Sequence, residues 1–536
     1  MSIEQHRSSS NKLSGMSTQQ HQPANTVIKS SLSIEIPAID IASYVFSSGT
    51  TISRGAPQYY DAESPSRNYS LAQAEIHVKR FARGLQNLGL RPGDRVLLYS
   101  GNRLFFPVVL WSVAAAGMVF TAASPTASAS AWTDIWASTE DVRIWTWEKL
   151  TDLEKVKSTT AVINYSSGTT GLPKGVEISH YNLVANSEQL LYKRNLVAKN
   201  SSGRARKERL DGSGERWLAP LPMYHAFGQA YSCMNAPRAG AKVFIMSKFT
   251  VAKYLQFLDI YRITLMTTVP TILSMISKYE QRQHFNLKSI EVVTSGSAPL
   301  DEQLASSIAQ KYLRSGVYVK QGWGMTETTC SVCGFSPDDI DDGRSIGWLN
   351  PNCALKIVPI SEDDSVSAAS RPSSTIGEIW VAGPQMMKGY WRNDKATQEI
   401  IVEDGQYRWV RTGDVGYVDA RGCVYIVDRI KELIKVKGLQ VAPAELAMAL
   451  CSYAGVVDAA VVGASINGNE YPRAFVVRKD ESVTVEALHN FIRSRFAAHK
   501  WLTGGIYFLE AIPRIPSGKV KKRDLPSIEG KVLARL

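Results

Sequence analysis

A glycine- and hydroxyl-rich stretch at residues 164–175 constrains the fold of this chain more than any other feature. It reads N-Y-S-S-G-T-T-G-L-P-K-G and follows an apolar lead, Ala161–Ile163. Glycines let backbone N–H groups approach an anion, hydroxyls add donors, and a lysine adds a point charge suited to phosphate oxygens. The spacing is not the Walker pattern G-x-x-x-x-G-K. The stretch predicts a strand running into a phosphate-binding loop, with a Ser/Thr/Gly-rich surface loop as the alternative.

Length and charge bound the architecture. At 536 residues the chain exceeds what one core usually holds, so we expect at least two domains. Its 44% hydrophobic and 21% charged residues are typical of an ordinary globular protein. The net charge of +12 is dispersed and forms no basic stripe, so nucleic acid is not an expected partner. A dispersed positive charge instead favours small anionic ligands.

Cysteine usage and hydropathy indicate a reducing compartment and no membrane span. Six cysteines follow no secreted framework, and the pair Cys330 and Cys333 lacks the second pair that a zinc site needs. The apolar run Leu104–Ala123 is long enough to cross a bilayer but is interrupted by Pro107 and Gly117. It predicts a buried helix followed by a strand.

Helix and strand patterns alternate before the glycine-rich stretch, which indicates a parallel α/β sheet. Ser70 and Gln73 form a capping box at the start of one amphipathic helix, and Gly89 suits its C-terminal end. The expected elements are a helix over 69–89, a strand over 95–100, a helix over 104–116 and a strand over 118–122. Further on, the basic segment Ala198–Glu215 contains Gly and Ser and is expected to be a mobile exposed loop.

Further motifs follow the glycine-rich stretch in a fixed order. They are P-M-Y-H at Pro222–His225, Q-G-W-G-M-T-E at Gln321–Glu327, T-G-D at Thr412–Asp414, D-R-I-K-E-L-I-K-V-K-G at Asp428–Gly438 and P-S-G-K at Pro516–Lys519. Together the motifs resemble the adenylate-forming, or acyl-activating, superfamily over roughly residues 31–525. Within it the chain is most similar to the 4-coumarate–CoA ligase-like acyl-CoA synthetases, a group that includes firefly luciferase.

The resemblance implies an α/β fold with two domains. A large N-terminal domain of layered mixed and parallel sheets with helices and a β-rich section would precede a small, mobile C-terminal α/β domain. The expected boundaries are a disordered tail over 1–30, the AMP-binding domain over 31–427, a hinge over 428–432 and a lid domain over 433–536. In the lid, the pattern predicts a hairpin over 434–441, helices over 444–454 and 485–500, and strands over 458–463 and 474–478.

The resemblance also implies ATP, Mg²⁺ and CoA as ligands and assigns residues to each. The catalytic residues would be Lys519, His225 and Thr326, with Glu327 as the Mg²⁺ ligand. Residues expected to bind ATP or AMP are Ser166, Ser167, Gly168, Thr169, Thr170, Gly171, Lys174, Ser297, Ala298, Pro299, Gln321, Gly322, Trp323, Gly324, Asp414 and Arg429. Lys431 would be the hinge, and Lys435, Lys437 and Gly438 would face CoA. The acyl pocket would contain Phe227, Gly228, Tyr231, Cys330, Ser331 and Val332.

The segment 126–165 departs from the family's pattern. Only 39 residues separate Thr126 from Ser166, where relatives ordinarily carry another helix and strand with a linker. An unpaired sheet edge there would be a folding liability. The shortening therefore keeps a catalytically silent pseudoenzyme as a competing prediction, although Lys174, Glu327, Asp414 and Lys519 are all present.

The main function predicted is an ATP-dependent acyl-CoA ligase. Residues 225–235 hold no acid that could bind an ammonium group, so the substrate is expected to be a carboxylic acid without an α-amine. Aryl, medium-chain and branched acids all fit the pocket residues. Two activities compete with this prediction: loading of a carrier protein in place of CoA, and a luciferase-like oxidation of the adenylate.

The last residues, Ala534-Arg535-Leu536, are similar to the S-K-L address of peroxisomal proteins. They predict recognition by the peroxisomal import receptor and a place in the peroxisomal matrix, with the cytoplasm as the alternative. A fungal secondary-metabolite pathway would fit such an enzyme by analogy.

Overall fold

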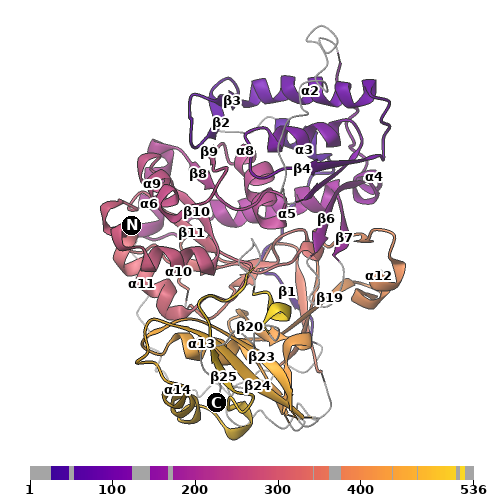
Figure 1. The fold of residues 1–536 in the computed structure, drawn as a ribbon. Helices are drawn as coiled ribbons and strands as arrows, with labels where there is room; N and C mark the ends of the chain where they lie inside the picture. The colour runs from indigo at the N-terminus through magenta and orange to yellow at the C-terminus, as the bar shows by residue number, and fades with distance from the viewer. Residues whose placement is uncertain are drawn as a thin grey trace, which may run out of the picture.

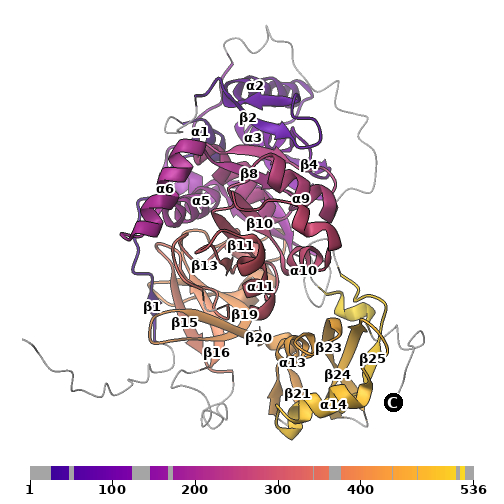
Figure 2. The ribbon, with the colours of Figure 1, turned by 90° about the vertical axis from the view of Figure 1, so that its left-hand side faces the viewer.

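The computed structural model describes residues 26–47, 53–123, 145–166, 173–341, 343–360, 376–436, 439–466, 469–514 and 520–525. They form a large N-terminal part and a small C-terminal part, the latter drawn in orange to yellow at the lower end of the molecule (Figure 1). A view at right angles shows the small part as a separate body beside the β-rich section of the large one (Figure 2). The predicted α/β class with two unequal domains is confirmed.

The first sheet of the large part is almost wholly parallel. Its order is β12-β11-β10-β8-β9-β2-β3, and the pairing is antiparallel between β2 and β3. The strands are β2 (Pro57–Asp61), β3 (Asn68–Ser70), β8 (Arg216–Ala219), β9 (Lys242–Ile245), β10 (Leu265–Thr268), β11 (Val292–Ser295) and β12 (Val319–Gln321). The P-M-Y-H motif follows β8, the predicted residues Ser297–Pro299 follow β11, and the Gln321–Glu327 motif begins at the last residue of β12. Because these strands are parallel, the motifs meet at one edge of the sheet.

The second sheet carries the glycine-rich stretch. Its order is β17-β7-β6-β5-β4. The strands are β4 (Arg95–Tyr99), β5 (Val119–Ala123), β6 (Thr160–Ser166), β7 (Lys174–Ser179) and β17 (Gly389–Tyr390). The strand predicted to lead into the loop is β6. It pairs antiparallel with β7, so the stretch is the connection of a hairpin.

Helices of the large part contribute much of its main core. They include α1 (Ile41–Phe46), α2 (Leu71–Asn87), α3 (Phe106–Ala115) and α5 (His180–Asn195). The predicted capping box of Ser70 and Gln73 is present at the start of α2. Every residue of α3 is buried, which explains the apolar run in the sequence. None of the helices within the described ranges combines the length and apolar character that a membrane span requires.

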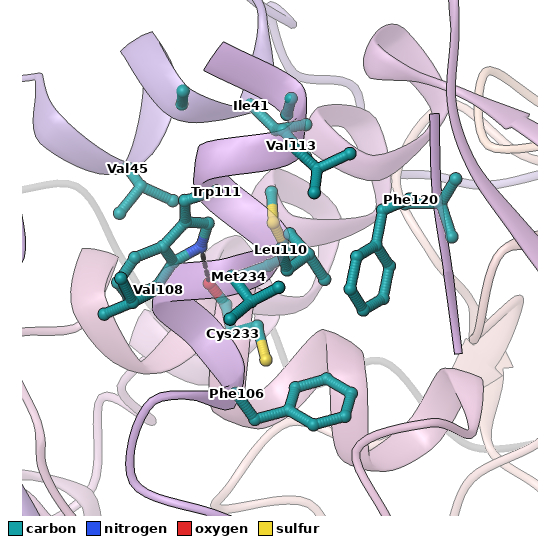
Figure 3. Packing of buried hydrophobic residues seen from close by; sticks show 14 of the residues in the cluster. Ile41, Val45, Phe106, Val108, Leu110, Trp111, Val113, Phe120, Cys233 and Met234 are labelled. Carbon is teal, nitrogen blue, oxygen red and sulfur yellow. Dashed lines mark hydrogen bonds between the residues drawn. The ribbon is translucent and has the colours of Figure 1, made fainter. Parts of the chain in front are cut away.

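The core fixes a π-helical turn, η2 (Ala230–Asn235), against α3. The indole N–H of Trp111 donates to the carbonyl oxygen of Cys233 at 3.0 Å, as Figure 3 shows. The hydroxyl of Tyr59 donates to the carbonyl oxygen of Ser232 at 2.8 Å. These bonds satisfy backbone acceptors of η2 and hold the turn in place.

A β-rich section joins the two parts of the molecule. Its strands are β1 (Ile28–Lys29), β15 (Ala354–Val358), β16 (Gly377–Ala382), β18 (Ile401–Glu403), β19 (Arg408–Val418) and β20 (Val424–Arg429). β1 pairs antiparallel with β15. Ile28 and Lys29 were expected to belong to a disordered tail over 1–30, but they form a strand of this sheet, and residues 1–25 lie outside the described residues.

The small part has its own core. Its elements are β21 (Ile434–Val436), β22 (Leu439–Val441), α13 (Pro443–Cys451), β23 (Val456–Ile466), β24 (Asn469–Arg478), α14 (Val485–Arg493) and β25 (Ile506–Phe508). The helix expected over 485–500 ends at Arg493. A direct contact with the large part comes from α10 (Pro270–Lys278), where Lys278 Nζ donates to the carbonyl oxygen of Val457 at 2.7 Å.

The exposed loop expected over 198–215 is a helix, so that prediction was wrong. Helix α6 (Ser201–Ser213) begins at Asn200, whose side chain accepts a hydrogen bond from Gly203 N. Arg206 forms an ion pair with Asp338 at 2.8 Å, and Arg209 pairs with Glu291 at 2.7 Å. These acids are distant in sequence, so local composition carries no sign of the contacts that hold the helix.

The shortened segment leaves no unpaired edge between the described strands around it. β5 pairs in parallel with both β4 and β6, so the sheet is continuous across the shortening. Residues 124–144 lie outside the described residues. On β4, Leu97 and Tyr99 remain 58% and 45% exposed, so one face of this outer strand is only partly covered.

Candidate active site

The two ends of the glycine-rich loop are held by the β6–β7 hairpin. Ser166 and Lys174 are paired residues of the β6–β7 hairpin, and residues 167–172, which include the predicted Ser167, Gly168, Thr169, Thr170 and Gly171, lie outside the described residues. β7 also pairs with β17, and this pairing places Tyr390 of β17 opposite Val176 of β7. Lys174 Nζ lies 4.7 Å from the centre of the Tyr390 ring. The lysine is therefore held over an aromatic face at the base of the loop.

Glu327 lies in the short helix η4 (Thr326–Thr328), which packs against β6 and β7. The hydroxyl of Tyr390 donates to Glu327 Oε1 at 2.8 Å, and both side chains are about nine-tenths buried. Burial and the charge of Glu327 raise the pKa of Tyr390 above its ordinary range, so the phenol stays protonated as a donor. The structure thus joins Lys174, Tyr390 and Glu327 at one point, with Thr326 next to them.

The Gln321–Glu327 loop is folded tightly on itself. Trp323 N donates to the carbonyl oxygen of Cys333, and Val332 N donates to that of Trp323. A Cβ on Gly324 would lie 2.0 Å from the carbonyl oxygen of Cys330, so only glycine fits there. Gln321 accepts a hydrogen bond from Leu300 N at 3.0 Å. Gln321 therefore ties this loop to the end of the turn Ser297–Pro299.

Asp414 is buried and bonded by two protein donors. The indole N–H of Trp323 donates to Oδ2 and the Arg429 guanidinium donates to Oδ1, both at 2.8 Å. The negative charge of Asp414 raises the pKa of Arg429, so the guanidinium stays charged. Trp323 was expected only to bind ATP or AMP, and its bond to Asp414 was not predicted. A carboxylate has about four acceptor positions, so Asp414 retains acceptors for a ribose.

The residues predicted near the acyl group fall into two groups. His225 occupies the position just before α7 (Ala226–Gln229), and Phe227 packs edge-on against Tyr231 at 5.1 Å between ring centres. A Cβ on Gly228 would lie 2.3 Å from the carbonyl oxygen of Pro222, which explains a glycine there. Tyr231 and Ser331 line an internal cavity of about 60 Å³, whereas Phe227, Gly228, Cys330 and Val332 do not line it.

Two of the predicted hinge and lid residues lie in described elements between β20 and α13. Lys431 is exposed in η7 (Ile430–Glu432), and Lys435 is exposed on β21. Asp428 accepts a hydrogen bond from Ala444 N at the start of α13, and burial raises its pKa. Lys437, Gly438 and Lys519 lie outside the described residues, so their predicted roles stay predictions.

The donor set around Glu327 fits a magnesium ion. Tyr390 occupies Oε1, and Oε2 makes no hydrogen bond to a described residue. One free carboxylate oxygen suits Mg²⁺, which binds enzymes through one or two carboxylates and takes its remaining oxygens from phosphates and water.

Sequence reasoning missed Tyr390. This residue sits in K-G-Y-W, which carries no recognisable catalytic pattern, and a tyrosine beside glycine is common in turns. Its place in the site shows only through its hydrogen bond to Glu327, which lies 63 positions away in the sequence.

Family models match most of the chain. The model described as AMP-binding enzyme matches residues 53–158 and 134–391, and the model of the AMP-binding enzyme C-terminal domain matches residues 445–519. The first model matches in two overlapping pieces, and the overlap, residues 134–158, lies inside the segment 126–165.

Curated relatives and solved structures agree with this match. Phenylacetyl-CoA ligase epaB of Aspergillus niger is 32% identical, covering 92% of this chain and 97% of that protein. Peroxisomal OPC-8:0-CoA ligase 1 of Arabidopsis thaliana is 30% identical, covering 92% and 93%. ATP-bound MatB from Rhodopseudomonas palustris has a TM-score of 0.75 at 22% identity, covering 91% of this chain and 99% of that one. At that identity the last likeness concerns the fold.

The matched regions contain every motif from which the resemblance was inferred, apart from the hinge and the T-G-D turn between them. With relatives above 30% identity over nearly its whole length, the chain belongs to the family of AMP-binding, adenylate-forming enzymes.

Proposed function

We propose that this protein is an AMP-forming acyl-CoA ligase. It activates a carboxylic acid with ATP and transfers the acyl group to CoA, releasing pyrophosphate and AMP. The observation that carries the proposal is the meeting of Lys174, Tyr390 and Glu327 at the base of the glycine-rich loop. The names of the curated relatives, which include an acyl-CoA ligase of Aspergillus niger, support it.

In the first half-reaction, a carboxylate oxygen of the acid attacks the α-phosphorus of ATP, and the bond to pyrophosphate breaks. Two anions must approach each other, so the site has to supply positive charge and fixed donors. Lys174 and the loop hydroxyls hold the β- and γ-phosphates. Mg²⁺ bound to Glu327 would neutralise phosphate charge. Asp414 holds the ribose, and Lys519 bridges the acid and the α-phosphate.

In the second half-reaction, the CoA thiolate attacks the acyl carbonyl carbon and AMP leaves. The same site serves this step if the small domain turns about Lys431, withdraws Lys519 and presents Lys435, Lys437 and Gly438 to CoA. The small domain has a core of its own, which supports such a rotation as a unit.

Pyrophosphate release and thioester formation test the proposal. Purified protein with ATP, Mg²⁺ and CoA is assayed against aryl, medium-chain and branched acids, with the thioester identified by mass. Pyrophosphate together with a CoA thioester is the expected result. Adenylate formation without thioester would indicate another acceptor such as a carrier protein. No pyrophosphate with any acid, although ATP binds, would refute the ligase and favour the silent pseudoenzyme.

We further propose import into the peroxisome through Ala534-Arg535-Leu536. The tripeptide resembles a peroxisomal address, and one relative is named as peroxisomal. A fluorescent protein fused ahead of the last residues should collect in peroxisomes, and removal of the tripeptide should return it to the cytoplasm. Equal distribution of both fusions would refute the address.

A further inference from the structure

A second pocket, with a volume of about 300 Å³, opens at the edge of the first sheet opposite to the predicted motifs. It is lined by helix α6 and by residues at the starts of β8, β10 and β11, whereas the motifs follow the ends of their strands. In Figure 2, α6 and α9 (Val251–Ile260) appear on either side of β8. Strands that rise by about 3.3 Å per residue separate the two edges, so this pocket is distinct from the candidate active site.

Arginine dominates the lining of this second pocket, which we call the arginine pocket. Its charged lining residues are Arg209, Arg216, Arg262 and Arg314, with Glu208 and Glu291 as the acids. Four cations and two anions give a formal charge of +2. The other described residues of the lining are glycine, serine and threonine, so among these residues the pocket has no apolar wall.

Folding accounts for only part of this charge. Arg209 donates through Nε and Nη2 to the two carboxylate oxygens of Glu291, both at 2.7 Å, and the Glu291 side chain is only 4% exposed. Arg314 Nε lies 3.7 Å from the same carboxylate. One carboxylate thus faces two guanidinium groups and can balance the charge of only one. Glu208 is exposed, so water and salt screen its charge.

The other two arginines lie where helix α9 ends. Arg216 Nε donates to the carbonyl oxygens of Tyr261 and Arg262, at 3.1 and 2.9 Å. Burial lowers the pKa of Arg216, and the positive charge of Arg262 lowers it further, which Glu215 offsets only in part. The exposed Arg262 side chain makes no hydrogen bond or ion pair to a described residue.

The backbone of Arg262 also has an unusual conformation. Its φ of 48° lies in the left-handed region, at the position after a helix that glycine usually occupies. A residue with a side chain is disfavoured there by about 1–2 kcal/mol. Such strained residues cluster at functional sites. Folding alone would be served better by glycine, so this cation calls for another role.

The charge and the walls of the arginine pocket restrict its ligand. A chloride ion or a single carboxylate would leave part of the formal charge of +2 unbalanced, whereas a phosphate monoester carries about −1.5 to −2 at neutral pH. Guanidinium groups bind phosphate oxygens through paired N–H donors. A volume of about 300 Å³ is at the lower end of the range for small-molecule sites, and walls without apolar side chains suit a polar organic part.

We propose that the arginine pocket binds the phosphate group of a small polar molecule through Arg216, Arg262 and Arg314. Inorganic phosphate and a phosphomonoester share this chemistry. The bound group would join Arg262, which follows α9, to Arg314, which follows α11 (Glu302–Tyr312). The site is separate from the adenylation site, and its existence does not depend on the proposed ligase activity.

Calorimetric titration of the full-length protein tests the site. The probes are inorganic phosphate, glucose 6-phosphate and glucose, each at low ionic strength. At least one of the two phosphates should bind to one saturable site with a dissociation constant of about 1 mM or below, and glucose should not bind. Tighter binding of glucose 6-phosphate would assign the site to a phosphomonoester, and equal or weaker binding would assign it to inorganic phosphate. Failure of both phosphates to bind would overturn the proposal.

Three variants separate the arginine pocket from the phosphate loop. Arg262→Gln should weaken phosphate binding by about tenfold or more, because it removes a charged donor. It leaves no acid among the described residues without its partner, so folding should be preserved. Arg83→Gln removes the same charge from an exposed position of α2 and should leave binding unchanged. Lys174→Gln alters the predicted phosphate loop and should also leave this binding unchanged. Binding that is lost in Lys174→Gln but kept in Arg262→Gln would overturn the proposal.

Amide hydrogen exchange of the full-length protein supplies a second readout, which locates the bound group. The phosphate that binds in the titration should slow exchange in peptides that cover α6 and the end of α9, and this protection should be absent in Arg262→Gln. Peptides of the exposed Arg83 region should not respond in either protein. Protection confined to the glycine-rich stretch would place the phosphate at the adenylation site and overturn the arginine pocket.

Discussion

The hydroxyl of Tyr390 offers a sharp test of how the adenylation site is built. Tyr390→Phe removes the 2.8 Å hydrogen bond to Glu327 but keeps the ring on which Lys174 rests. A hydrogen bond to a charged group contributes about 1.5–3 kcal/mol, and both partners are buried here. If about 2 kcal/mol of this holds Glu327 in position for the metal, the rate of adenylation should fall about 30-fold.

The assay is exchange of labelled pyrophosphate into ATP as the Mg²⁺ concentration is varied. The variant should need more Mg²⁺ for half-maximal exchange, whereas thioester formation from supplied acyl-adenylate should be retained. Tyr425→Phe is the matched control, because it removes a hydroxyl that donates to Asp419 at the β19–β20 turn. Unchanged Mg²⁺ dependence in Tyr390→Phe, or an equal loss in both variants, would refute a positioning role for Tyr390.

Three further predictions concern the lid, the α6 helix and pH. Lys519→Ala should abolish pyrophosphate exchange and largely spare thioester formation from supplied adenylate; equal loss of both would contradict its assignment. Arg206→Ala should lower the free energy of unfolding in denaturant by about 3 kcal/mol, because it leaves the mostly buried carboxylate of Asp338 without its ion-pair partner. Lys207→Ala, which breaks an exposed ion pair with Asp211, should lower it by less than about 0.5 kcal/mol, and similar losses in both variants would contradict a stabilising role of Arg206 in α6. Because burial lowers the pKa of Lys193 from 10.5 to about 8, the unfolded chain binds more protons than the folded one above pH 8, so this lysine makes stability rise with pH from about 8 toward 10. The thermal unfolding temperature of Lys193→Met should rise less between pH 8 and 10 than that of the wild type. An identical dependence of this temperature on pH in both proteins would contradict the lowered pKa of Lys193.

Secondary structure was predictable wherever the sequence carries a local pattern. The helix with the Ser70 capping box and the buried helix within Leu104–Ala123 were both expected, and both are present. Capping and apolar periodicity are properties of a few adjacent residues, so they can be read without the fold. Helix α6 was missed for the opposite reason. Its Arg206 and Arg209 are stabilised by acids 132 and 82 residues away.

The candidate site was also predictable only in part. The motifs around Lys174, Glu327 and Asp414 are recognisable as sequences. The parallel strands β8, β11 and β12 bring the P-M-Y-H motif, the Ser297–Pro299 turn and the Gln321–Glu327 loop to one edge of the first sheet. The bonds between them were not predictable. Tyr390 reaches Glu327 across 63 positions, and Trp323 reaches Asp414 across 91, because separate loops end at the same point in space.

The sequence by itself determined the family, the two-domain α/β class and the chemical types of the reacting residues. These follow from short motifs, whose meaning depends on the spacing of adjacent residues. Tertiary structure alone decided which side chains bond to one another. It also decided that the Oδ1 atoms of Asn235 and Asn350 have no donor among the described residues, and that Lys193 is buried away from water. Burial and unsatisfied hydrogen bonding exist only once distant segments have packed together.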